Sequence, residues 1–190
     1  MKKETKQEIL QEVLYILRTI VICSVAVFIC TRLFVKPIRV DGTSMHPTLR
    51  DDDFGISFVL GSLLQNYHRF DVVIVYSLSE NKELIKRIIG LPGETIEYKD
   101  SLLYVNGKQV AETFFDDDYV NSQTWGGTLD FTEDFGPVRL QEDEYFLMGD
   151  NRPASLDSRE LGVFHSKDIR CKYALILFPF QHFNLVIHDN

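Results

Sequence analysis

The chain has 190 residues, of which 45% are hydrophobic and 12% aromatic, and its formal net charge is -8. This length and composition suit one folded domain and exclude a disordered chain. Residues 36–190 carry 15 basic and 25 acidic side chains, so the sequence offers no basic face for nucleic acid. Neither a metal nor a cofactor is expected, because the five histidines lack zinc-ligand spacing and the three cysteines form no CxxC motif.

The first predicted element is an apolar segment near the N-terminus. Its core, TIVICSVAVFICT, has no charge between Arg18 and Arg32. With its apolar flanks it covers 13–35, about 34 Å as a helix, which is enough to cross a bilayer. The following TRLFVKPIRV has no small-x-small cleavage site. We therefore predict a short tail over 1–12 and an uncleaved transmembrane anchor over 13–35; a buried amphipathic core helix is the alternative.

Charge discriminates weakly between the two orientations of this anchor. Basic side chains lie on both sides of the span, so the positive-inside rule gives little contrast. The large acidic domain after a short tail favours a cytoplasmic N-terminus and an extracytoplasmic domain over 36–190. In either orientation Ser44 follows the span by about ten residues, which predicts that it acts close to the membrane surface.

After the anchor, the sequence predicts strands rather than long helices. Asn106-Gly107 is a strong signal for a two-residue hairpin turn, and Pro92-Gly93 suits a type II turn. From 111 to 144 the pattern is weak, and we predict a small inserted cap of irregular β structure over 107–143, with one long loop as the alternative. The strand-like stretches are β-branched or alternating and lie within 69–78, 83–110, 144–149 and 172–180.

Ser44, in DGTSMHPTL, is the candidate nucleophile. A serine hydroxyl needs a neighbouring base to activate it. The nucleophile-elbow pattern GxSxG is absent, because His46 takes the place of its last glycine. His46 is also a poor base on geometry, since two residues of separation do not give the oriented contact that a triad needs. We interpret His46 as a surface or substrate-lining residue.

Lys86, in LIKRIIGLPGE, is the second candidate base. Strand alternation puts Lys86 and Arg87 on opposite faces, so one of the two cations must face apolar surroundings. Burial lowers the pKa of an ammonium group, and a neutral amine can take a serine proton as in Ser-Lys variants of the triad. The ordinary alternative is one snorkelling and one salt-bridged side chain.

The stretch MGDNRPASLDSRELGVF, at 148–164, follows an apolar strand and is dense in small polar and charged residues. Such density suits a hydrogen-bonded loop network beneath a functional site. A polar surface turn is the alternative.

Taken together, GTSMHPTL, KRIIGLPGE and GDNRPASLDSR resemble the motifs of type I signal peptidases, and RFDVVIVY adds a weaker match. These membrane-anchored Ser-Lys peptidases remove signal peptides. The motifs run in the family's order from the anchor to about Phe164, and the short chain with one span looks like the Gram-positive branch. The resemblance implies a mostly β protein: a transmembrane helix, then an antiparallel β-sheet catalytic domain with a small β insert.

Carried over by position, the resemblance implies that Ser44 is the nucleophile and Lys86 the general base, with Ser155 orienting the lysine amine. The main-chain N–H of Ser44 would donate to the oxyanion. Asp157 and Arg159 would form a supporting ion pair. The same resemblance gives Arg87, Asp150 and Asn151 a role in shaping the loop, and it places Val40, Met45, Leu49, Leu84 and Ile85 in the wall of the pockets for small side chains.

Two positions depart from the family's pattern. Gly42 stands where some members have a serine whose hydroxyl completes the oxyanion hole. Either a backbone donor or Thr43 substitutes here, or the hole is weaker, and loss of one donor typically costs about 10²–10³-fold in rate. Phe70 stands where the weaker motif usually has glycine, so the resemblance does not predict the conformation of the local turn.

The expected activity is that of a membrane-anchored serine endopeptidase that cleaves signal peptides from secreted preproteins after a small-x-small site. One alternative is a dedicated paralogue that processes or assembles a single client such as a pilin; another is a non-catalytic assembly factor. The expected partners are secreted preproteins and membrane lipid. An association with the secretion machinery is also expected.

Overall fold

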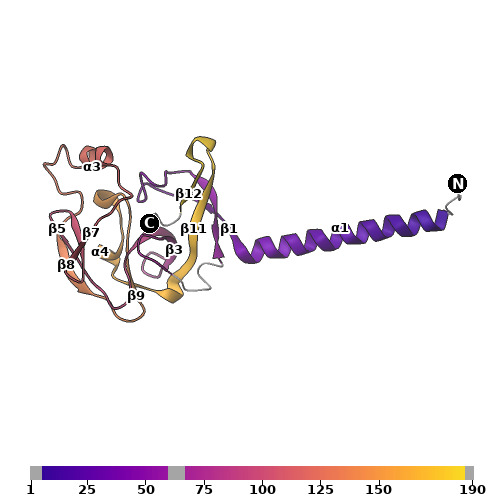
Figure 1. Ribbon diagram of the computed structural model, residues 1–190, viewed down its shortest axis with the longest axis horizontal. Helices are drawn as coiled ribbons and strands as arrows, with labels where there is room; N and C mark the ends of the chain where they lie inside the picture. The colour runs from indigo at the N-terminus through magenta and orange to yellow at the C-terminus, as the bar shows by residue number, and fades with distance from the viewer. Residues whose placement is uncertain (1–5, 60–66, 187–190) are drawn as a thin grey trace.

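The computed structural model describes residues 6–59 and 67–186. Helix α1, Lys6–Phe34, projects from a β domain (Figure 1), and its stretch Glu8–Ile29 is long and apolar enough to cross a membrane. None of that stretch is buried against the rest of the protein, which argues against the alternative of a core helix. The helix begins earlier than the predicted span of 13–35, and Val35 already belongs to the first strand.

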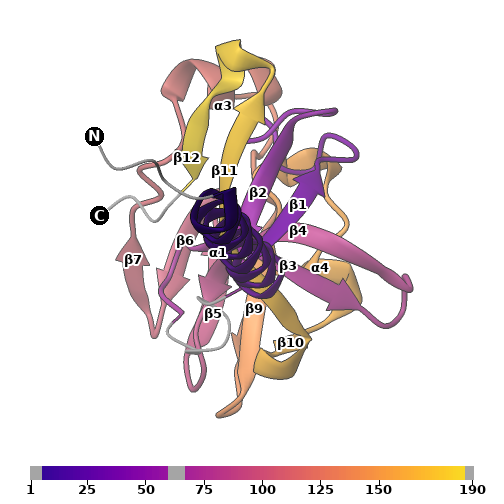
Figure 2. The same cartoon turned by 90° about the vertical axis from the view of Figure 1, so that its right-hand side faces the viewer.

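The larger of two antiparallel sheets holds the centre of the domain. Within the described residues it has eight strands in the order β1-β2-β11-β3-β4-β9-β10, with β12 paired to β11. Figure 2 looks nearly along α1 and shows β1, β2 and β11 behind the helix. The strands are β1 (Val35–Arg39), β2 (Phe54–Phe58), β3 (Val72–Ser77), β4 (Lys82–Gly90), β9 (Glu144–Met148), β10 (Phe164–His165), β11 (Ile169–Phe178) and β12 (Asn184–Val186).

The smaller sheet lies at the end of the domain away from α1 (Figure 1). Its four described strands have the order β7-β6-β5-β8. Asn106 and Gly107, with φ of 52° and 75°, form the predicted two-residue hairpin turn between β6 and β7. The strands are β5 (Thr95–Lys99), β6 (Leu102–Val105), β7 (Lys108–Val110) and β8 (Phe135–Arg139).

The inserted cap differs from the prediction of irregular β structure over 107–143. The smaller sheet already begins at Thr95, and between β7 and β8 the chain forms a helix, α3 (Asp117–Gln123). The Asp116 side chain caps this helix by accepting from the Asp118 N–H at 2.7 Å. The other short helices lying within the described residues are η1 (Arg152–Ala154), α4 (Ser158–Leu161), η2 (Ser166–Asp168) and η3 (Phe180–His182).

Apolar clusters cover both faces of β4. A cluster that includes Ile74 packs on one face, and a cluster that includes Val75 packs on the other. Consequently Lys86 and Arg87 are both buried, with 2% and 3% of their surface exposed. The prediction that one of the two cations faces apolar surroundings is too narrow, because neither face of the strand is open to water at these two positions.

Phe70 shows how the chain accommodates a residue where glycine is usual. Its φ is 71°, in the left-handed region that favours glycine, yet its side chain is buried and lies 5.1 Å from the Phe114 ring between centroids. Its carbonyl accepts from Arg87 Nη1 at 2.8 Å. The backbone at Phe70 therefore keeps the left-handed conformation that glycine usually adopts in this turn. The packing of the buried ring offsets the strain of that conformation.

Phe70→Gly is expected to lower the free energy of unfolding by about 1–4 kcal/mol. Relief of the left-handed backbone contributes about 1–2 kcal/mol, whereas loss of a buried phenyl ring costs about 3–5 kcal/mol. Thermal or denaturant unfolding of the detergent-solubilised chain measures the difference. A variant as stable as the wild type would show that the ring adds nothing beyond the strain it imposes.

Candidate active site

Ser44 and Lys86 meet although 42 positions separate them in the chain. The Lys86 Nζ donates to the Ser44 Oγ at 2.8 Å. Ser44 lies in the turn between β1 and β2, which is held by the buried side chains of Met45 and Leu49 and by the bond from Leu49 N–H to the Met45 carbonyl. Lys86 lies within β4, so a rigid strand presents the amine to the serine.

Burial changes the acid–base behaviour of Lys86. Desolvation lowers the pKa of its amine from 10.5 to about 8, although the charges of Asp157 and Asp150 act in the opposite direction. At neutral pH roughly a tenth of such an amine is neutral, against less than a thousandth of an ordinary lysine. The amine can therefore accept the proton of the hydroxyl that it touches.

His46 faces a different neighbour. Its ring lies 5.4 Å from the Tyr119 ring between centroids, and its carbonyl accepts from the Tyr119 Oη at 2.9 Å. Tyr119 belongs to α3, so the inserted segment contacts the turn that carries Ser44. This placement agrees with the interpretation of His46 as a lining residue rather than the base.

The loop after β9 contains the ion pair that the resemblance implied. Arg159 Nε and Nη2 each donate to one oxygen of Asp157 at 2.9 Å, and the Gly149 N–H donates to Asp157 Oδ2 at 3.0 Å. Burial acts to raise the pKa of Asp157, but the bonds and charge of Arg159 outweigh it and lower the pKa below its ordinary value. Asp157 is therefore a buried carboxylate that stays ionised.

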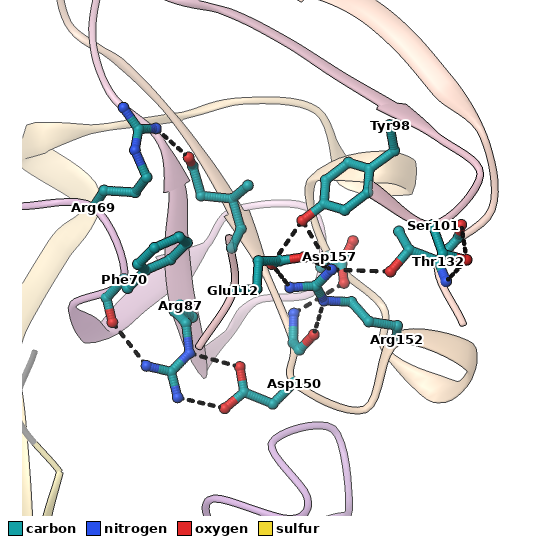
Figure 3. Close-up of polar contacts among 12 residues, drawn as sticks. Arg69, Phe70, Arg87, Tyr98, Ser101, Glu112, Thr132, Asp150, Arg152 and Asp157 are labelled. Atoms are coloured by element: carbon teal, nitrogen blue, oxygen red, sulfur yellow. Dashed lines mark hydrogen bonds and ion pairs between the residues drawn. The ribbon is translucent and has the colours of Figure 1, made fainter. Parts of the chain in front are cut away.

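A second buried ion pair joins β4 to the same loop. Arg87 donates to both oxygens of Asp150, at 2.8 Å from Nε and 2.6 Å from Nη2 (Figure 3), a bidentate geometry that fixes both groups. Thr48, in the Ser44 turn, donates to Asp150 Oδ2 at 2.6 Å. Sequence reasoning passed over Thr48, although it stands inside GTSMHPTL with the hydroxyl that a carboxylate partner needs.

Asn151 holds the nucleophile turn directly. Its N–H donates to the Ser44 carbonyl at 3.0 Å, and its Nδ2 donates to the Thr43 carbonyl at 3.2 Å. The loop of 149–159 thus fixes the backbone on both sides of the Ser44 amide. Together with Asp150, this places the predicted loop-shaping residues in contact with the serine turn.

Family comparison and motif geometry lead to the same group of proteins. The family model described as signal peptidase, peptidase S26, matches residues 13–178. Signal peptidase I of Bacillus licheniformis is 37% identical over 165 residues, which cover 86% of this chain and 88% of the relative. The chain belongs to the signal peptidase I family. The resemblance drawn from the motifs is thereby confirmed.

Two further signal peptidases are similar to this chain. Signal peptidase I T of Bacillus subtilis (strain 168) is 36% identical over 165 residues, covering 86% of this chain and 84% of the relative. A crystal structure of a signal peptidase I from Enterococcus faecalis V583 is 34% identical, with a TM-score of 0.49, and covers 56% of this chain and 96% of that one. The chain is thus a serine peptidase of family S26, anchored in the membrane by its apolar helix.

In this signal peptidase, Ser155 lies beside the Ser44–Lys86 pair without the lysine contact that the resemblance implied. Its buried Oγ makes no hydrogen bond of standard geometry among the described residues, but its side chain acts on Asp157 and helps to lower the pKa of that carboxyl. A Cβ added at Gly149 would lie 2.1 Å from that Oγ and 2.4 Å from the Ser44 carbonyl oxygen. Only glycine at 149 permits this approach, so the position of Ser155 is built into the loop.

The turn before Ser44 narrows the choice of oxyanion donors. Gly42 adopts φ of 89°, and its N–H donates to Asp51 Oδ1 at 2.8 Å. That N–H is therefore engaged within the turn. The Ser44 N–H and Thr43 remain the candidate donors.

The five predicted pocket residues do not form one exposed wall. Ile85 is partly exposed and packs on the core cluster that contains three of the others. Leu84 is also partly exposed but packs on the cluster at the opposite face of β4, because neighbouring residues of a strand alternate. Only Leu84 and Ile85 therefore offer accessible surface; the buried three are Val40, Met45 and Leu49.

Proposed function

We propose that this signal peptidase cleaves preproteins with a Ser-Lys dyad, Ser44 as nucleophile and Lys86 as general base, after a small-x-small site. The observation that carries the proposal is the 2.8 Å contact between Lys86 Nζ and Ser44 Oγ, made by an amine whose pKa is lowered to about 8. A serine with an adjacent base of suitable pKa is the arrangement that nucleophilic catalysis requires.

The chemistry follows from these two groups. The neutral Lys86 amine accepts the hydroxyl proton while the Ser44 Oγ attacks the scissile carbonyl. The resulting ammonium then protonates the leaving amine, and the acyl-enzyme forms. Lys86, neutral again, takes a proton from water, whose oxygen attacks the ester. The Lys86 ammonium then returns this proton to the Ser44 Oγ as the ester bond breaks, which releases the cleaved signal peptide and restores the free enzyme. The Ser44 N–H stabilises the oxyanion in both steps.

The position of the anchor suits a substrate that is itself inserted in the membrane. Helix α1 ends at Phe34, ten residues before Ser44, and leads directly into β1. An extended substrate would lie between the segment entering Ser44 and β4, its alternate side chains facing Leu84 on one side and Ile85 on the other. We place the N-terminus in the cytoplasm and the domain of 36–190 outside, where it meets substrates from the secretion machinery; protease protection of spheroplasts distinguishes the two orientations.

A preprotein with an Ala-x-Ala site tests the substrate class. The full-length chain in detergent or lipid vesicles is expected to cut after the second alanine. Replacement of either alanine by phenylalanine is expected to reduce cleavage by at least about 100-fold, because a small pocket has no space for the ring. Equal cleavage of the phenylalanine variants would contradict the proposed site. Cleavage of a pilin precursor alone would identify a dedicated paralogue.

A further inference from the structure

Arg152 is a fully buried guanidinium that the proposed reaction does not use. It follows Asn151 in the loop of 149–159, here called the catalytic loop, and its side chain points toward the smaller sheet (Figure 3). Nη1 donates to the Tyr98 Oη at 2.8 Å and to the Thr132 Oγ1 at 2.9 Å, and the Glu112 carboxylate accepts from Nη1 and Nη2. The three acceptors come from β5, the segment after β7 and the segment before β8. One cation therefore binds three separate segments of the smaller sheet and the cap.

The same guanidinium has one bond into the catalytic loop. Arg152 Nε donates to the Gly149 carbonyl at 3.1 Å. Gly149 is the residue whose N–H holds Asp157 and whose missing side chain leaves room for Ser155 beside the Ser44 carbonyl. Arg152 therefore fixes Gly149, the residue that positions Asp157 and Ser155 next to the Ser44–Lys86 pair.

Glu112 is the carboxylate that pairs with Arg152. Burial alone would lower the pKa of the guanidinium, but the charge of Glu112 raises it above its ordinary value. Glu112 also accepts from the Tyr98 Oη at 2.8 Å, which orients the carboxylate. The rings of Phe115 and Tyr98 lie 4.9 Å and 5.3 Å from the Arg152 Cζ. A guanidinium in this apolar surround cannot keep its place without its counter-charge.

We propose that Glu112 is a positioning residue for peptide-bond cleavage: through Arg152 it makes the smaller sheet hold Gly149, and with it Asp157 and Ser155, in register with Ser44 and Lys86. This inference rests on the proposed Ser-Lys function. It gives the smaller sheet a task in catalysis, since no residue of that sheet touches the dyad among the described contacts. Loss of the Glu112 charge releases Arg152 and loosens the loop, while the surface under the substrate at Leu84 and Ile85 stays unchanged.

Glu112→Gln in the full-length protein tests the proposal beside Glu97→Gln as a matched control. Glu97 also lies in the smaller sheet but pairs with the exposed Lys99 at 2.7 Å. On the Ala-x-Ala preprotein, Glu112→Gln is expected to lower kcat about tenfold and to leave KM within about twofold. The midpoint of its pH–rate profile is expected at lower pH, because a displaced Asp157 supports the ammonium form of Lys86 less. Glu97→Gln is expected to match the wild type in all three.

Hydrogen–deuterium exchange gives a readout that needs no activity. Glu112→Gln is expected to speed exchange in 149–157 at least about tenfold, with β3 unchanged as the internal reference. The proposal would be overturned if Glu112→Gln had the kcat, the pH midpoint and the exchange rates of the wild type. It would also be overturned if the loss of kcat were no larger than the loss of folded protein. Tyr98→Phe, which removes one bond to the same node, is expected to lower kcat two- to threefold if Glu112→Gln fails to fold. The two proposals can also fail separately. If Glu112→Gln speeds exchange in 149–157 as expected but the wild-type protein cleaves no preprotein, the Ser-Lys function is refuted and the link between Glu112 and the loop stands.

Discussion

Ser44→Ala and Lys86→Met are each expected to lower kcat/KM on an Ala-x-Ala preprotein by about 10⁴-fold or more. The nucleophile and its base act as one unit, so removal of either is expected to cost nearly as much as removal of both. The double variant should therefore be little worse than either single variant. Cleavage assays with the full-length protein in detergent measure all three.

Lys82→Met is the matched control for the lysine substitution. Lys82 begins the same strand, but its side chain is exposed and lies 3.9 Å from Glu80. Its removal is expected to change kcat/KM by less than about twofold, because an exposed pair contributes little. If Lys86→Met kept substantial activity, the base would have to be another group, and His46 would be the first to examine.

Lys86→Met is also expected to stabilise the fold, which separates loss of activity from loss of structure. A lysine with a pKa of about 8 when folded and 10.5 when unfolded carries a penalty of about 3 kcal/mol while it is charged. The penalty is full below pH 8 and disappears above pH 10.5, because the unfolded state binds the extra proton between these values. The variant should therefore exceed the wild type in unfolding free energy at pH 7 and lose this advantage near pH 11.

The sequence predicted those features of the fold that depend on local pattern. The Asn106-Gly107 hairpin and the strands around Lys86 follow from turn chemistry and alternation, and the structure contains both. Helix α3 was missed because seven residues are too few for a periodic signal, although the Asp116 cap was visible. The start of the smaller sheet at Thr95 was missed because strand pairing between β5 and β8 is non-local.

The site could be predicted only where a motif carried the information. Contact between Ser44 and Lys86 was predicted from the family's motifs, since alternation alone left the lysine as an ordinary paired cation. The burial of Met45 and Leu49 was not foreseen, because their motif positions do not tell whether a side chain faces the substrate or the core. The role of Glu112 had no signal at all, as it lies outside every motif and meets Arg152 only in the folded chain.

The pH dependence of kcat/KM is expected to identify the base. Only neutral Lys86 can accept the Ser44 proton, and its neutral fraction rises tenfold per pH unit below the pKa of about 8. Activity should therefore rise about 50-fold between pH 6 and pH 8 and level off above about pH 9. A histidine base would level off near pH 6.5, and a lysine with an ordinary pKa would still gain activity at pH 10. Either profile would contradict the assignment of a buried Lys86 as the base.

Asp157→Asn sharpens this test, because it moves the midpoint through a known charge. The Asp157 carboxylate raises the pKa of Lys86 while desolvation lowers it. Removal of this negative charge takes away the larger of the two carboxylate charges that raise the pKa of Lys86, while Asp150 still raises it and desolvation and the charge of Arg159 still lower it. The midpoint should therefore move to lower pH even though the loosened loop reduces the maximal rate. A midpoint that stays in place would mean that the titrating group lies elsewhere, since Lys86 and Asp157 are coupled across this buried loop.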